Sequence, residues 1–187
     1  MGPAELDKTL AARLLPATDA GLYAAAQRTV GAITLPVSAM MLSALPRLYR
    51  EGQEPTAQTS HLLIWIFAAS TTYGLASAGA LWLIAPLVEW LFGTAYHGIQ
   101  DMIRWLCLAM PGMALRIAAG LVLTAVAPPW MRVSVELIGL AALGLGSIIL
   151  ISYFGGVGMP LAIAGAESIM AAIAVTMVIW RTATAAT

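Results

Sequence analysis

Residues 61–88 read HLLIWIFAASTTYGLASAGALWLIAPLV and contain no Asp, Glu, Lys or Arg. Crossing ~30 Å of hydrocarbon takes about 20 helical residues, because only a helix satisfies its own backbone hydrogen-bonding groups there. This stretch exceeds that length and belongs to the longest uncharged run of the chain, residues 55–88. It therefore predicts a membrane-spanning helix.

The composition of the whole chain agrees with this prediction. Of its 187 residues, 60% are hydrophobic and 10% are charged, and the mean hydropathy is +0.87. An average soluble protein is only ~45–50% apolar. The nine basic and nine acidic residues form no basic run, which excludes an electrostatic footprint for nucleic acid. We predict an all-α, polytopic integral membrane protein.

Four further stretches are long enough to cross a bilayer, which gives about five transmembrane helices. Prolines and glycines mark their ends, at Pro46, near Pro86, at Pro128-Pro129 and in the GGVGMP turn of residues 155–160. Pro111-Gly112 interrupts the third helix. The predicted helices span about residues 21–46, 61–88, 98–127, 131–154 and 159–181.

Residues 1–20 form a separate predicted segment before the transmembrane lobe of residues 21–187. They hold the short amphipathic piece LDKTLAARLLP, at residues 6–16, which is too charged and too short to span the bilayer. We expect it to lie at the membrane interface.

Loop charges indicate the orientation of the chain. With five crossings, Arg47, Arg50, Arg132 and Arg181 fall on the side that carries the C-terminus. The opposite side has Arg104 in its loops, with Lys8 and Arg13 in the N-terminal tail. The positive-inside rule therefore favours a cytoplasmic C-terminus.

Arg116 and Glu167 are the two charged residues in the middle of predicted spans. A charge at the bilayer centre costs ~2.5–3.5 kcal/mol on insertion scales, so each needs a partner, a wet cavity or a function. Small residues flank both at helical spacing: Ala109, Gly112 and Gly120 around Arg116, and Ala164, Ala171 and Ala174 around Glu167. Both faces are thus predicted to point into the bundle.

Two interpretations of this pair remain open. In the first, Arg116 and Glu167 neutralise each other and fix helix packing. In the second, the Arg116 guanidinium binds a phosphate or another anion, and Glu167 changes protonation or releases Arg116 as a transporter changes conformation. If their helices run in the same direction, the two residues lie at comparable depths and an ion pair is geometrically possible.

Three other charged or polar positions have local explanations. Gln27 and Arg28 begin a polar stripe that can meet an anionic headgroup, although snorkelling of Arg28 to the interface explains it as well. Glu136 follows Arg132 by four residues and is predicted to pair with it locally.

Catalytic and cofactor sites are not predicted. The sequence holds no Ser-His-Asp set and no Gly-rich phosphate loop followed by Lys. A single cysteine, Cys107, and two distant histidines, His61 and His97, offer no zinc cluster. We therefore expect neither an enzyme nor a metal or other cofactor.

Several short motifs resemble, in order and spacing, the second half of bacterial polysaccharide flippases. This family belongs to a superfamily that also holds multidrug exporters and exporters of lipid-linked precursors. The matching segments are LDK at residues 6–8, DAGLYAAAQR at 19–28, PRLYRE at 46–51, LFGTAY at 91–96 and GGVGMPLAIAGAE at 155–167. Each motif is short, but together they are spread over nearly the whole chain, from residue 6 to residue 167.

The resemblance implies one lobe of a two-lobe transporter in the bacterial inner membrane, with a cytoplasmic C-terminus. Members of the family are built from two six-helix lobes around a central cavity. This chain would supply the second lobe with a shortened first helix, so a further N-terminal lobe or a partner chain would complete the cavity.

The implied substrate is an isoprenoid-pyrophosphate-linked oligosaccharide, such as an O-antigen or capsule unit, with Arg28 and Arg116 as candidates for its anionic headgroup. Two alternatives remain open. One is a multidrug-type exporter of the same superfamily, and the other is an inactive or partner-dependent membrane fragment. Genes for glycosyltransferases beside this gene would favour the flippase.

Overall fold

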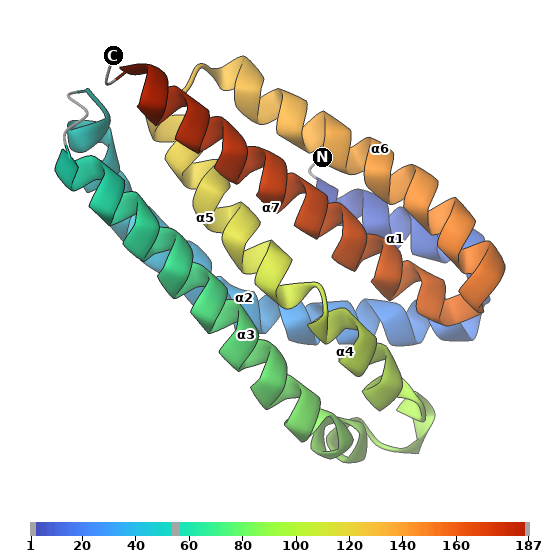
Figure 1. The fold of residues 1–187 in the computed structure, drawn as a ribbon. Helices are drawn as coiled ribbons and strands as arrows, with labels where there is room; N and C mark the ends of the chain where they lie inside the picture. The colour runs from blue at the N-terminus through green and yellow to red at the C-terminus, as the bar shows by residue number, and fades with distance from the viewer. Residues whose placement is uncertain (1–2, 54–56, 186–187) are drawn as a thin grey trace.

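The computed structural model describes residues 3–53 and 57–185, and confirms an all-helical fold (Figure 1). The described residues form seven α-helices and two short 3-10 turns. The helices are α1 (Pro3–Leu14), α2 (Ala17–Gln53), α3 (Ala57–Phe92), α4 (Ile99–Cys107), α5 (Met110–Val126), α6 (Pro129–Phe154) and α7 (Gly158–Ala185). The 3-10 turns are η1 (Thr94–Tyr96) and η2 (Gly155–Val157).

The helices pack around α5 and α7. α7 lies between α6 and α5, while α5 also contacts α2 and α3 (Figure 1). α1 packs against α6 and α2, on the far side of α7 in this view. α3 is peripheral and makes its main contacts with α5 and α4.

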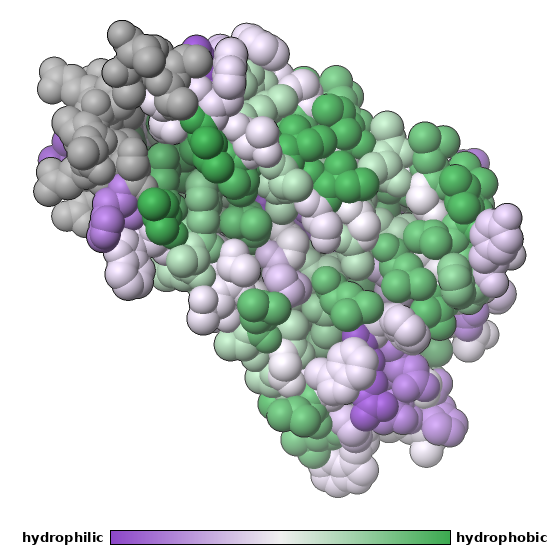
Figure 2. All heavy atoms as spheres, viewed as in Figure 1, coloured by the Kyte–Doolittle hydropathy of each residue, from purple (hydrophilic) through white to green (hydrophobic). Residues whose placement is uncertain are grey.

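Much of the outer surface is apolar. Large hydrophobic side chains such as Leu83, Trp90 and Tyr153 are 77% exposed or more. Figure 2 shows hydrophobic residues over most of the viewed face, with a hydrophilic group gathered at one end of the molecule. Exposed apolar surface of this extent marks contact with a membrane or with other proteins.

Three stretches of the described residues are long and apolar enough to cross a bilayer, and a fourth is added if the bent pair α4 and α5 forms one span. The stretches are Ala17–Pro46, His61–Phe92 and Pro129–Thr182. The last contains both α6 and α7, of 26 and 28 residues, which fold back on each other at η2. Counting those two helices separately gives five crossings, a number that stays a prediction.

Two helices continue beyond their predicted ends, although the candidate membrane span in α2 does end at Pro46. α2 continues through Pro46 to Gln53, and α3 continues through Pro86 to Phe92. A proline removes one backbone donor, but the remaining hydrogen bonds of a helix this long hold it together. The polar linker after Pro46 is therefore mostly helix.

Other predicted boundaries are confirmed closely. α5 ends at Val126 and α6 begins at Pro129, a position where proline suits the first turn of a helix. α6 ends at Phe154, and Gly155 takes a φ of +59°, which turns the chain toward α7.

The third predicted helix is broken, as its Pro-Gly pair indicated. α4 and α5 meet at a bend of 48° around residues 108–109. Pro111 lies in the first turn of α5, and a proline disfavours helical geometry in the residue before it. The break therefore lies just before the predicted interruption.

Gly74 brings α3 and α5 into close contact. A Cβ atom at this position would lie 2.8 Å from the Pro111 Cα atom and 3.1 Å from the Met110 carbonyl oxygen. Only a residue without a side chain permits this approach. The peripheral helix α3 is thus held against the centre of the bundle at the start of α5.

Residues 3–14 form the helix α1, which packs against the bundle along one side. Ala11 is 1% exposed and Asp7 is 3% exposed, whereas Leu6 and Leu14 face outward. A buried carboxylate on this helix was not anticipated from its amphipathic pattern. The interfacial position predicted for residues 1–20 stays a prediction.

Candidate functional site

Arg116 of α5 and Glu167 of α7 form an ion pair inside the helical bundle. Arg116 Nε donates a hydrogen bond to Glu167 Oε2 at 2.5 Å, and the two side chains are 21% and 11% exposed. The two helices pack directly against each other, so both small-residue faces point inward as the sequence indicated. The structure therefore confirms the predicted proximity of these two charges.

Glu136 of α6 forms a second ion pair with the Arg116 guanidinium. Its Oε1 atom lies 3.6 Å from Arg116 Nη1, and the Glu136 side chain is 29% exposed. The structure contradicts the predicted pairing of Glu136 with Arg132. The Glu136 side chain turns toward Arg116 of α5, while Arg132 is exposed.

A second buried polar pair lies where α1 meets α2. The Tyr23 hydroxyl donates a hydrogen bond to Asp7 Oδ2 at 2.8 Å, and Tyr23 is completely buried. Sequence reasoning missed this pair because residues 1–20 were assigned to the membrane interface. Asp7 and Tyr23 lie on either side of the break between α1 and α2, and no helical spacing relates two residues across such a break.

A small cavity connects these groups. It has a volume of about 50 Å³, and Asp7, Gln27, Arg116 and Glu167 supply its polar wall. The rest of the wall is apolar or small and consists of Met113, Gly139, Leu143, Ile163, Ala166 and Met170. A cavity of this size has room for water molecules and small ions only.

Two oxygen atoms near Arg116 are buried without a hydrogen-bond partner among the described residues. They are Gln27 Oε1, in the cavity wall, and Glu136 Oε2. Buried acceptors of this kind are usually paired with protein or with ordered water. Both can accept a hydrogen bond from a water molecule or a protonated carboxyl group.

The charges of the ion-pair cluster do not balance when every group is ionised. Glu136 and Glu167 carry two negative charges, and Arg116 carries one positive charge. Uncompensated charge is costly in a low-dielectric interior. Uptake of a proton by one of these carboxylates would reduce that cost, so the site is chemically suited to hold a proton.

The structure separates the four residues proposed from the sequence. Gln27, Arg116 and Glu167 line one cavity. Arg28 is exposed on another side of α2, and no ion pair of Arg28 is found in residues 3–53 and 57–185. The polar stripe that was to join Gln27 and Arg28 is therefore divided between the interior and the surface.

No protein-family model, curated protein or solved structure matches this chain. The resemblance to polysaccharide flippases accordingly rests on the short sequence motifs alone. One of them has a clear structural role in the described residues. In LFGTAY, the Phe92 and Tyr96 rings pack edge to face at 5.2 Å, and Gly93 between them has a φ of +82°.

The same turn is closed by Glu89, at the end of α3. Its Oε2 atom accepts a hydrogen bond of 3.1 Å from the backbone N–H of Gln100, in the first turn of α4. Its Oε1 atom lies 2.7 Å from His97 Nδ1. A carboxylate at a helix start satisfies a free backbone donor. Glu89 therefore positions α4 and has no evident chemical role.

Metal ligands are not gathered in the part of the chain that the structure describes. No group of three or more His, Cys, Asp or Glu side chains there has the geometry to hold a metal ion. Cys107 is buried and is 3% exposed. The interactions that the candidate site shows are ion pairs and hydrogen bonds.

Proposed function

We propose that this chain is a membrane transport lobe of the polysaccharide flippase type. Its substrate would be an isoprenoid-pyrophosphate-linked oligosaccharide, which moves across the bacterial inner membrane. The observation that supports this proposal is one guanidinium, Arg116, engaged by carboxylates from two other helices inside an apolar bundle. Ionisable residues at such positions mark transport pathways and proton relays in membrane proteins.

In this proposal Arg116 is a coupling residue. Two carboxylates already engage it, and its cavity of about 50 Å³ is far below the ~300–1,000 Å³ of sites that hold organic ligands. Protonation of Glu167 would weaken its bond to Arg116 and allow α5 and α7 to shift relative to each other. The guanidinium would then exchange between two sets of partners as the lobe rocks.

Arg28 is the proposed contact for the anionic headgroup. It is exposed on α2, while its neighbour Gln27 lines the coupling cavity. The two residues are consecutive, so a ligand bound to Arg28 would act on the same helical turn that forms the cavity wall. A shift of α2 on substrate binding would therefore move the cavity wall beside Arg116.

A structural role for the ion pair is the second candidate, and close packing beside it favours that role. A Cβ atom at Gly112 would lie 3.1 Å from the Ser168 amide nitrogen and 3.2 Å from the Glu167 carbonyl carbon. Helices in such contact resist sliding, which suits a pair that only fixes packing. The chain would then be a membrane subunit without transport activity.

The decisive experiment measures export of the lipid-linked oligosaccharide in a flippase-deficient host. The full chain is expressed alone and together with the first lobe of a flippase. Arg116→Lys, Glu167→Gln and Arg28→Gln are compared at equal protein abundance in the membrane. The proposal predicts restored export with the wild-type chain and its loss in each variant.

Unchanged export in Arg116→Lys and Glu167→Gln would leave only the structural role for the pair. Failure of the wild-type chain under both conditions would contradict the flippase proposal. Resistance to toxic cations without oligosaccharide export would instead identify a multidrug-type exporter.

A further inference from the structure

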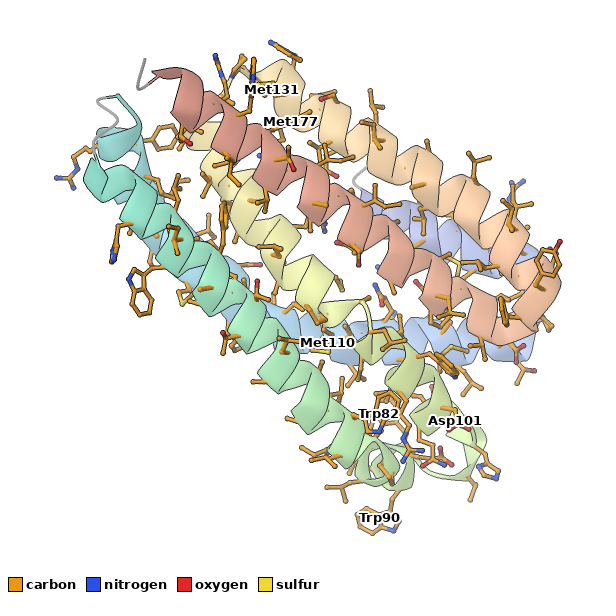
Figure 3. The ribbon with its side chains drawn as sticks, in the orientation of Figure 1. Trp82, Trp90, Asp101, Met110, Met131 and Met177 are labelled. Atoms are coloured by element: carbon orange, nitrogen blue, oxygen red, sulfur yellow. The ribbon has the colours of Figure 1, made fainter. Side chains whose placement is uncertain are left out.

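A groove opens between the start of α6 and the end of α7, away from the charged cavity. Its volume is about 520 Å³. Met131 and Met177, labelled in Figure 3, lie close together on the two helices that form it. The full lining consists of Trp130, Met131, Ala172, Ile173, Thr176, Met177 and Trp180.

The wall of this α6/α7 groove is apolar in character. Thr176 supplies its one hydroxyl group, and that hydroxyl donates a hydrogen bond to the Ala172 carbonyl of its own helix at 2.7 Å. Ala172 and Thr176 are small and exposed, so they leave the groove open along α7. A flexible hydrocarbon chain matches such a surface.

Two tryptophans place this groove at a membrane boundary. Trp130 is 65% exposed at the start of α6, and Trp180 is 58% exposed near the end of α7. Exposed tryptophans of membrane proteins concentrate at headgroup level. The groove thus begins at the interface and extends into the hydrocarbon region.

Cations lie at the same end of the groove. Arg132 directly follows Met131 and is exposed, and Arg181 lies one helical turn beyond Met177. The nearest acidic residue of α6, Glu136, is turned away toward Arg116. This end also carries Arg50 at the last turn of α2, so it is the end that the positive-inside rule assigns to the cytoplasm.

We propose that the α6/α7 groove binds an anionic phospholipid of the cytoplasmic leaflet. One acyl chain lies between Trp130 and Trp180, and the phosphate meets Arg132 and Arg181. Charge complementarity selects this occupant, because basic pockets between transmembrane helices on the cytoplasmic side recognise anionic headgroups. The site is separate from the coupling cavity and does not depend on the proposed transport activity.

The test uses native mass spectrometry of the full chain released from detergent. Phosphatidylglycerol and phosphatidylcholine with identical acyl chains are added in equal amounts, and the bound fraction of each is measured. The wild-type chain is expected to retain phosphatidylglycerol preferentially. Arg132→Gln and Arg181→Gln should each weaken its retention about five-fold, and leave phosphatidylcholine unchanged.

A second set of variants tests the acyl-chain contact. Ala172→Phe fills the groove and should abolish retention of the lipid, and Ala172→Leu should reduce it. The matched controls are Arg13→Gln, an exposed arginine of α1, and Ala141→Phe, an exposed alanine of α6 outside the groove. Both controls should bind phosphatidylglycerol as the wild type does.

Three results would overturn the proposal. These are equal retention of the two lipids by the wild type, equal losses in Arg13→Gln and Arg181→Gln, and full retention in Ala172→Phe. A dimer cross-linked through residue 172 with no bound lipid would show that a second copy covers the groove instead.

Discussion

Arg116 on α5 donates through its Nε atom to Glu167 on α7, and the two side chains are 21% and 11% exposed. Removing one member of a buried ion pair leaves the other charge without compensation, at a cost of ~3–5 kcal/mol. Arg116→Met should therefore lower the free energy of unfolding by about that amount, measured by denaturation in mixed micelles. The double variant Arg116→Met/Glu167→Gln should recover most of the loss.

Arg28→Met is the matched control for that measurement. Arg28 is exposed, and a surface substitution of this kind changes the free energy of unfolding by ~0.5 kcal/mol or less. A loss in Arg116→Met no larger than that in the control would contradict the buried pair.

Gly74 should be intolerant of even one added carbon atom. A Cβ there meets the Pro111 backbone at 2.8 Å, so Gly74→Ala must push α3 away from α5, at a cost of ~1–3 kcal/mol. Gly79 lies on the same helix with no atom within 4 Å of its Cβ position. Gly79→Ala should be neutral or stabilising, and thermal unfolding of both variants in detergent compares them.

Tyr23→Phe should destabilise the chain through Asp7. The phenol supplies a hydrogen bond of 2.8 Å to a carboxylate that is 3% exposed, and losing a donor to a buried group costs ~1–3 kcal/mol. Tyr153→Phe removes a hydroxyl from a residue that is 80% exposed and should have no measurable effect. Equal melting temperatures for the two variants would argue against the buried contact.

Single cysteines can establish the orientation of the helices. The variants Thr94→Cys, Ser152→Cys and Trp130→Cys are each made in a Cys107→Ala background. Positions 94 and 152 are at one end of the bundle, and position 130 is at the other. A membrane-impermeant maleimide added to intact cells should label positions 94 and 152 only. Position 130 should react after permeabilisation, and labelling of 94 and 152 from different sides would rule out the predicted topology.

The sequence predicted the parts of this molecule that depend on neighbours along the chain. Uncharged runs gave the long helices, and Pro128-Pro129 and GGVGMP gave their connections, because these signals act within a few residues. Pro46 and Pro86 misled the assignment, since the other backbone hydrogen bonds of a long helix outweigh one missing donor.

The candidate site was predictable only in part. The small residues around Arg116 and Glu167 indicated inward faces, and the two side chains do meet. Asp7 and Glu136 were assigned to other surroundings, because their partners come from helices distant in sequence. A local pattern gives the face of a helix but not the neighbour that the face contacts.

The bend between α4 and α5 also bears on the thickness of bilayer that the chain can occupy. Residues 99–126 in one straight helix would extend ~42 Å, well beyond the ~30 Å of an ordinary hydrocarbon layer. The 48° change in direction shortens the extent of the segment along the membrane normal, so a smaller tilt of the segment fits it to the bilayer. Straightening it would favour a thicker lipid environment, which makes residues 108–109 a determinant of hydrophobic matching.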